Sequence, residues 1–175
     1  FLVSLGVDFD VAMQALACAK RNRLFTMLNA SGRHELPDEA YQGLDLLIIN
    51  RTDCAYLSGI QPVDDKACER ALRLFAGKGV KDTVILLKER GSATLVDGSY
   101  LRVPGYEVDV VDASCGGDTY VGELAARLSE GGSLAESMVY ASAAAALSLT
   151  KVGAQESIPS WSEVQSFVED HRTRA

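Results

Sequence analysis

Short hydrophobic runs alternate with segments of helical periodicity along the first ninety residues or so of the chain. Residues 8–21 and 64–77 place apolar side chains three and four positions apart, which predicts two helices. A shorter helix is expected over 52–58, with Thr52 as its N-cap. Four apolar runs have the length of β-strands: FLVSL (1–5), LFTML (24–28), LDLLIIN (44–50) and TVILL (83–87). This alternation predicts an α/β domain with a mainly parallel sheet flanked by helices.

The remaining residues predict a hairpin followed by helices. Residues 92–103 are typical of a hairpin that turns at Asp97-Gly98, a favoured pair for tight turns. The stretch MVYASAAAALSL (138–149) is apolar on nearly every side, which predicts a buried helix. The last two helices are each preceded by the Ser-x-x-Glu spacing of a capping box, at Ser133/Glu136 and Ser160/Glu163.

Composition limits the class of protein and its partners. The 175 residues are 47% hydrophobic and 23% charged, which predicts a single globular domain over residues 1–175. The net charge is −7 and no basic run occurs, so a nucleic-acid partner is not expected. No apolar run reaches the ~20 residues of a membrane helix, and no signal peptide is visible, so no membrane partner is expected either.

The spacing of the cysteines argues against a zinc site, and their presence without such spacing is typical of a protein in a reducing compartment. No pair has Cys-x-x-Cys spacing, and the chain contains only two histidines. A cytoplasmic location is therefore the simplest interpretation. Two of the four cysteines, Cys18 near the apolar face of the helix at 8–21 and Cys54 in the helix at 52–58, are expected in the core.

The candidate chemistry lies in VVDASCGGDTYVGELAARLSEG (110–131), where Asp118 follows a glycine pair as a helix begins. Gly116 and Gly117 permit backbone conformations that let several N–H groups point at one anion, and the helix dipole adds to the attraction. Asp118 could accept a proton from a hydroxyl while those N–H groups hold a phosphoryl group. The alternative is that Asp118 only stabilises the helix terminus, by roughly 0.3–1 kcal/mol.

Two long segments resemble a known family. VDASCGGDTYVGELAARLSEGGSLAESMVYASAAAALSLTKVGAQESIP (111–159) resembles the C-terminal signature of the ribokinase-like (PfkB) sugar kinases, whose pattern is Asp-Thr-Thr-Gly-Ala-Gly-Asp-Thr-Phe. LNASGRHELPDEAYQGLDLLIINRTDCAYLSGI (28–60) resembles the family's Leu-Asn-Pro-Ala-Pro-Ala-Arg and Asn-Glu-Thr-Glu segments. The resemblance implies a ribokinase-like α/β fold without the family's β-sheet lid and most of its sugar contacts. The absence of these parts, and an opening strand without Met, predict a piece of a longer protein.

The resemblance also implies an activity and its residues. It implies transfer of a phosphoryl group from ATP to a primary hydroxyl of a sugar, with ribose O5 as the first choice. Asp118 would be the catalytic base. The anion hole would be formed by Cys115, Gly116 and Gly117. ATP and Mg²⁺ would be bound by Asn50, Asp53, Lys88, Gly91 and Ser142. A monovalent cation, K⁺, would be bound by Asp112, Ser114, Ser148, Gly153 and Ser157.

Three positions depart from the family pattern. Cys115 stands at a Gly or Ala position, where its thiol is expected to crowd the phosphate or to make the site oxidisable. Asp53 replaces a Glu and is one methylene shorter. Lys88 replaces a Gly that faces the nucleotide, and it would either supply a positive charge or degrade the site.

Two alternatives to ribose phosphorylation stay open. The first is a kinase for another sugar or for a nucleoside. The second is a truncated, non-catalytic nucleotide-binding module, which would have no sugar kinase activity. Its open sheet edge would favour a homo-oligomer.

Overall fold

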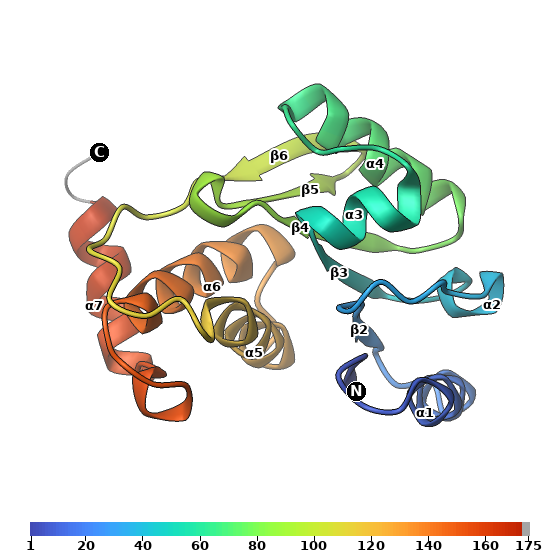
Figure 1. Cartoon of the computed structure of the whole chain (residues 1–175), viewed down its shortest axis with the longest axis horizontal. Helices are drawn as coiled ribbons and strands as arrows, with labels where there is room; N and C mark the ends of the chain where they lie inside the picture. The colour runs from blue at the N-terminus through green and yellow to red at the C-terminus, as the bar shows by residue number, and fades with distance from the viewer. Residues whose placement is uncertain (173–175) are drawn as a thin grey trace. The chain divides into compact units, whose positions relative to one another are not determined.

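The computed structural model describes residues 1–172 and confirms the α/β class. Six strands follow chain order in one sheet (Figure 1): β1 (Leu2–Ser4), β2 (Met27–Asn29), β3 (Leu46–Asn50), β4 (Asp82–Leu86), β5 (Ser92–Val96) and β6 (Ser99–Val103). The helices are α1 (Phe9–Arg21), α2 (Asp38–Tyr41), α3 (Arg51–Ser58), α4 (Asp65–Gly77), α5 (Gly116–Ser129), α6 (Leu134–Leu149) and α7 (Trp161–Arg172), with short 3₁₀ turns η1 (Lys88–Arg90) and η2 (Gln155–Ser157).

The chain divides into two compact units. Unit 1 comprises residues 1–87 and 93–102, and unit 2 comprises residues 88–92 and the chain from 103 onward. The expectation of a single domain over residues 1–175 stays a prediction. Each unit is described by itself below.

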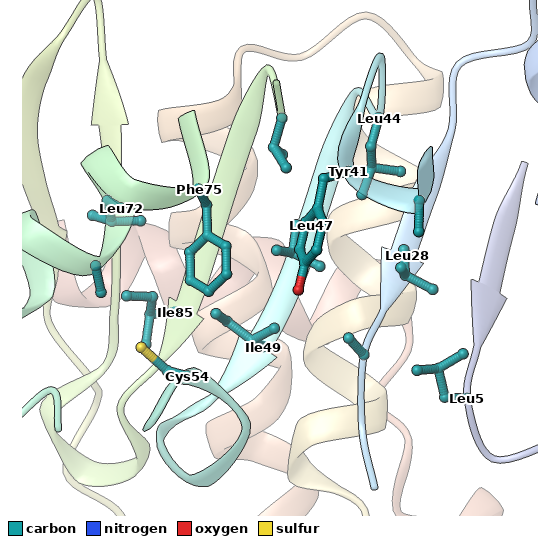
Figure 2. Packing of buried hydrophobic residues seen from close by; sticks show 14 of the residues in the cluster. Leu5, Leu28, Tyr41, Leu44, Leu47, Ile49, Cys54, Leu72, Phe75 and Ile85 are labelled. Atoms are coloured by element: carbon teal, nitrogen blue, oxygen red, sulfur yellow. The ribbon is translucent and has the colours of Figure 1, made fainter. Parts of the chain in front are cut away.

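The first four strands of unit 1 pair in parallel, as their apolar runs predict. The register aligns Leu46 of β3 with Met27 of β2 on one side and with Asp82 of β4 on the other. Leu47 and Ile49 on one face of β3 and Ile48 on the other are completely buried, which is expected for a parallel strand with both faces covered. Figure 2 shows Leu47 and Ile49 among the side chains of the core, together with Phe75 of α4. Burial of each such side chain contributes about 1.5–3 kcal/mol.

Helix α1 forms where predicted, and its buried face does not include Cys18. Asp8 caps the helix by accepting a hydrogen bond from the Val11 N–H at 3.1 Å. The face toward the core is formed by Ala12, Leu16 and Ala19. Val11 is 60% exposed and Cys18 is also exposed, so the expectation of a core position for Cys18 was wrong. Both residues lie one position before a buried alanine, which is about 100° around the helix.

Strand β2 begins at Met27, three residues later than the apolar run suggests. Leu24 donates its N–H to the Ala19 carbonyl at 3.1 Å and therefore belongs to the turn that ends α1. Leu24 and Phe25 are consequently half-exposed.

The helices of unit 2 confirm the predicted buried helix, the capping box at Ser160/Glu163 and the cap at Ser133. Helix α6 contacts both α5 and α7 (Figure 1), and it buries Met138 and most of its alanines. Ser133 accepts a hydrogen bond from the Glu136 N–H at 3.3 Å. Glu163 accepts from the Ser160 N–H at 2.7 Å, and Ser160 accepts in return from the Glu163 N–H. These contacts satisfy N–H groups that a helix start leaves without partners.

Two glycines allow the backbone segments before and after the hairpin to approach each other closely. The predicted hairpin turns at Asp97 and Gly98, whose φ values of 49° and 75° give the left-handed pair of a tight turn. Before the hairpin, Gly91 has a φ of +87°, and a Cβ there would lie 2.0 Å from the Val103 carbonyl oxygen. A Cβ on Gly105 would lie 2.7 Å from the Glu89 carbonyl oxygen. Only glycines permit this close approach within unit 2.

Among the helices of residues 1–172, none combines the length and the apolar character that a membrane span requires.

Candidate active site

Helix α5 begins with unpaired N–H groups and a carboxylate beside them. Cys115 is the N-cap residue, and its side chain accepts no hydrogen bond from a backbone N–H group of the helix. Within residues 1–172 the backbone N–H groups of residues 115–118 have no acceptor. Asp118 is exposed in the first turn, and no side chain in that range pairs with it. A helix terminus with free N–H groups is suited to hold an anion, and a free carboxylate is suited to accept a proton.

The two glycines differ in what surrounds them. A Cβ on Gly116 would lie 2.8 Å from the Leu149 Cδ2, so this glycine allows α6 to pack closely beneath the turn. A Cβ on Gly117 would meet no atom within 4 Å. Gly117 therefore borders open space, where an anion can approach the backbone.

The Cys115 thiol is turned into the protein. The residue is only 8% exposed, and its Sγ lies 3.0 Å from the Ser157 Oγ and 3.4 Å from the Ala154 carbonyl oxygen. The thiol that was expected to crowd a bound phosphate is therefore buried against residues 153–157.

Asp112 fastens the turn that precedes α5. One carboxylate oxygen accepts hydrogen bonds from the N–H and hydroxyl of Ser114, and the other accepts from the Gly153 N–H at 3.0 Å. The Ser114 hydroxyl, followed by the Gly153 N–H and Ser114 N–H, lowers the pKa of Asp112 below its usual value. The carboxylate thus stays ionised and holds residues 112–114 against residue 153.

These contacts join four of the five residues proposed for K⁺. Asp112, Ser114 and Gly153 are linked directly, and Ser157 is linked to them through Cys115. The fifth residue, Ser148, donates its hydroxyl to Ala145 and accepts the Lys151 N–H at its carbonyl. Oxygen ligands of this kind suit a hard monovalent cation. Within residues 1–172, no group of three or more His, Cys, Asp or Glu is arranged to hold a metal ion.

In unit 1, Asn50 and Asp53 lie where β3 ends and α3 begins. Asn50 is the N-cap of α3, since its Oδ1 accepts the N–H groups of Thr52 at 2.8 Å and Asp53 at 2.9 Å. The expectation that Thr52 caps this helix was therefore wrong. An Asn amide reaches the N–H groups two and three residues ahead, and the helix begins one residue earlier than predicted.

Asp53 is a buried carboxylate with one oxygen left free. It is 2% exposed, and its Oδ1 accepts the Arg33 N–H at 3.4 Å. Its Oδ2 has no hydrogen-bond partner in the described part of the chain. Burial raises the pKa of Asp53, and hydrogen bonds from the backbones of Arg33, Gly32 and Asn50, together with the Arg33 charge, partly offset this. A free carboxylate oxygen fits a divalent cation or one of its waters.

The Arg33 contact was missed by the sequence analysis, which gave this residue no role. Arg33 has a φ of 56°, a left-handed value that is uncommon outside glycine. The Ser31-Gly32 pair before it was the available signal, since such pairs mark turns that aim consecutive N–H groups at one acceptor.

Replacing Asp53 by Asn is expected to raise the Tm at pH 7 by roughly 2–4 °C, the response of a domain of this size to 1 kcal/mol. Because the folded pKa is raised, the contribution of Asp53 to stability is largest below its unfolded pKa of about 3.9. That contribution falls as the pH rises through the folded pKa. Thermal melts from pH 4 to pH 7 should therefore show a higher Tm for D53N than for wild type only near pH 7. Asp109→Asn, at an exposed position, should show no such trend, and a D53N variant less stable than wild type at pH 7 would contradict this account.

The remaining proposed nucleotide residues belong to unit 2. Lys88 is exposed with a φ of +57°, a left-handed value that explains the glycine expected there from the family pattern. Its side chain has no partner among residues 1–172. Gly91 makes the close crossing described above. Ser142 of α6 is 6% exposed, and its hydroxyl has no partner in the described range, so it could accept or donate to a ligand.

Among curated proteins, the chain is similar to the ribokinase of Haemophilus influenzae, with 32% identity over 168 residues, 96% of this chain and 55% of that protein. It is also 29% identical over 175 residues to the bifunctional ribokinase/ribose-5-phosphate isomerase A of Fructilactobacillus sanfranciscensis, covering 99% of this chain and 32% of that protein. The chain thus spans about half the length of the ribokinase and a third of the bifunctional protein.

Solved structures give the same fold. The Arabidopsis thaliana ribokinase complexed with ribose and ATP matches with a TM-score of 0.90 and 25% identity, covering 96% of this chain and 55% of that one. The Thermotoga maritima ribokinase matches with a TM-score of 0.84 and 30% identity, covering 96% and 56%. The model of the pfkB family carbohydrate kinases matches residues 2–161. The chain therefore belongs to the pfkB family of carbohydrate kinases.

Proposed function

We propose that the protein containing this chain transfers the γ-phosphoryl group of ATP to a primary hydroxyl of a sugar, with ribose O5 as the preferred acceptor. The observation that carries this proposal is the start of α5, where the exposed Asp118 carboxylate adjoins four unpaired N–H groups. A proton acceptor and an anion site at one helix terminus are the two elements that phosphoryl transfer to a hydroxyl requires.

In the proposed reaction, Asp118 accepts the proton of the sugar hydroxyl as its oxygen forms a bond to the γ-phosphorus. The bond between that phosphorus and the bridging oxygen of ATP breaks, and ADP leaves with the electron pair. The N–H groups of Cys115, Gly116 and Gly117 stabilise the negative charge on the transferring group. The products are the sugar phosphate, ADP and the proton held on Asp118.

The proposed cofactor residues fall in both units. Asn50 and Asp53 would organise Mg²⁺ and its waters, and the free Oδ2 of Asp53 supports that role. Mg²⁺ supplies charge neutralisation on the phosphates when it is bound. Lys88, Gly91 and Ser142 would contact the nucleotide, and Asp112, Ser114, Ser148, Gly153 and Ser157 would hold K⁺. The orphaned Ser142 hydroxyl and the unpaired Lys88 side chain support these assignments.

The choice of ribose is supported by the relatives named ribokinase, at 28–32% identity, in Haemophilus influenzae and Staphylococcus aureus. A second acceptor is favoured by the deoxyribokinase of Salmonella typhi, which is 27% identical over 169 residues. The sugars of these two enzymes differ by one hydroxyl, so direct competition distinguishes them. The buried thiol of Cys115 leaves the anion site open, which favours an enzyme over the non-catalytic module.

A thermal-shift titration of the chain with Mg-ATP and Mg-ADP tests the nucleotide part of this proposal. Nucleotide at 100 times its dissociation constant should add about 2.7 kcal/mol to the free energy of unfolding. A well-folded sample whose Tm does not respond would contradict a nucleotide site in this chain. A coupled ADP-release assay of the full-length protein with ribose and deoxyribose then tests the acceptor, and ribose is expected to give the higher kcat/KM.

A further inference from the structure

Cys115 lies between two segments of unit 2 that the proposed function requires to stay together. The first is the turn 112–118, which carries the anion site and Asp118. The second is the segment 153–157, which includes two of the residues proposed for K⁺. The Cys115 Sγ lies 3.0 Å from the Ser157 Oγ, 3.4 Å from the Ala154 carbonyl oxygen and 3.9 Å from the Gly153 carbonyl oxygen.

The hydroxyl of Ser157 makes hydrogen bonds both to Cys115 and to Ala154. It donates to the Ala154 carbonyl oxygen at 2.8 Å, which leaves its oxygen lone pairs to accept from the Cys115 thiol. The thiol can therefore donate to the Ser157 hydroxyl oxygen, which is one of the oxygens proposed to hold the monovalent cation. Oxygens gathered in this way need either a cation or an N–H, O–H or S–H donor among them.

Cys115 also provides a side-chain hydrogen-bond donor that the family pattern lacks at this position. The family usually has Gly or Ala at this position, and neither has a side-chain donor. Without such a donor, the link from the turn to residue 153 would rest on the Asp112 carboxylate and on any cation bound beside it. Here Asp112 accepts the Gly153 N–H at 3.0 Å, and the buried thiol adds a second, independent link.

We infer that the Cys115 thiol holds the anion-binding turn against segment 153–157 and thereby replaces part of the stabilising role proposed for K⁺. This inference rests on the proposed function. Cys115 is a positioning residue, because it acts on the N–H groups of the turn and not on the phosphate. The chain should consequently depend less on K⁺ than a variant without this side chain.

Thermal melts of the full chain in KCl and in NaCl at equal ionic strength test the inference without nucleotide. In NaCl, Cys115→Ala is expected to lower the Tm, and KCl should recover about 2–4 °C of that loss. Wild type should respond to K⁺ by less than half as much. Cys115→Ser keeps a donor and should respond like wild type. Cys54→Ala is the matched control, because Cys54 is also a buried cysteine but lies in unit 1. Its loss of Tm should be equal in both salts.

The same samples with Mg-ATP give the second readout. In NaCl, the affinity of Cys115→Ala for Mg-ATP should be about fivefold weaker than that of wild type, the effect of one net hydrogen bond, and KCl should restore it.

Two results would overturn the inference. One is a Cys115→Ala variant that loses the same Tm in both salts, as the Cys54→Ala control does. The other is a wild type that responds to K⁺ as strongly as Cys115→Ala. If Mg-ATP changes the Tm of no protein in the series, the proposed nucleotide site is contradicted. The melts without nucleotide then still test the positioning role of Cys115.

Discussion

Replacing Asp118 by Asn in the full-length protein is expected to lower kcat by about 10²–10⁴-fold, the usual contribution of a general base. The amide cannot accept the hydroxyl proton, yet it has nearly the same shape as the carboxylate. The unpaired N–H groups at the start of α5 remain, so the dissociation constant for Mg-ATP should change little. The measurement is kcat by ADP release, together with Mg-ATP affinity from the thermal shift.

This variant also separates the two interpretations of Asp118. If the carboxylate only complements the helix dipole, D118N loses roughly 0.3–1 kcal/mol of stability and keeps its turnover. Asp170→Asn, at an exposed position on α7, is the control for removing one negative charge. A D118N enzyme with wild-type kcat would remove Asp118 from the chemistry.

Replacing Gly91 by Ala is expected to cost about 3 kcal/mol of stability, which corresponds to a fall in Tm of roughly 6–12 °C. The added Cβ would lie 2.0 Å from the Val103 carbonyl oxygen and 2.5 Å from the Gly105 nitrogen. Both are backbone atoms, so no side-chain rotation can relieve the overlap. The left-handed φ of +87° adds strain of its own. Urea unfolding, with Tm as a second measure, gives the loss.

Gly131→Ala separates the overlap from the strain. Gly131 has a φ of +88°, almost the same as that of Gly91, and a Cβ there would meet no atom within 4 Å. Its substitution should therefore cost only the strain, about 1 kcal/mol. Equal losses for the two alanine variants would show that the crossing at Gly91 contributes nothing.

The elements that the sequence predicts well are those whose signal is local. The continuous run 44–50, the Asp97-Gly98 turn and the Ser160/Glu163 capping box depend on residues close together in the chain, and all three are confirmed. Positions that depend on distant contacts were predicted less well. Helix α1 has an apolar face, but Cys18 lies outside it. Which residues next to that face become buried depends on the elements that pack against α1.

The same distinction applies to the candidate site. Asp118 and the glycine pair are recognisable because a helix start has a local signature. The direction of the Cys115 thiol depends on a segment about forty residues later, and the burial of Asp53 depends on the turn that contains Arg33. Neither contact has a spacing that sequence periodicity can detect, so the structure was needed to place both side chains.

The order of strands in the sheet has a consequence for how the chain folds during synthesis. From β2 to β6, every strand pairs with the strand made immediately before it. Each strand from β2 onward therefore finds a partner that has already left the ribosome. As the sheet grows strand by strand, each newly exposed edge is covered by the next strand, which shortens the time during which that edge can aggregate, while the outer edge of β1 has no strand partner within residues 1–172.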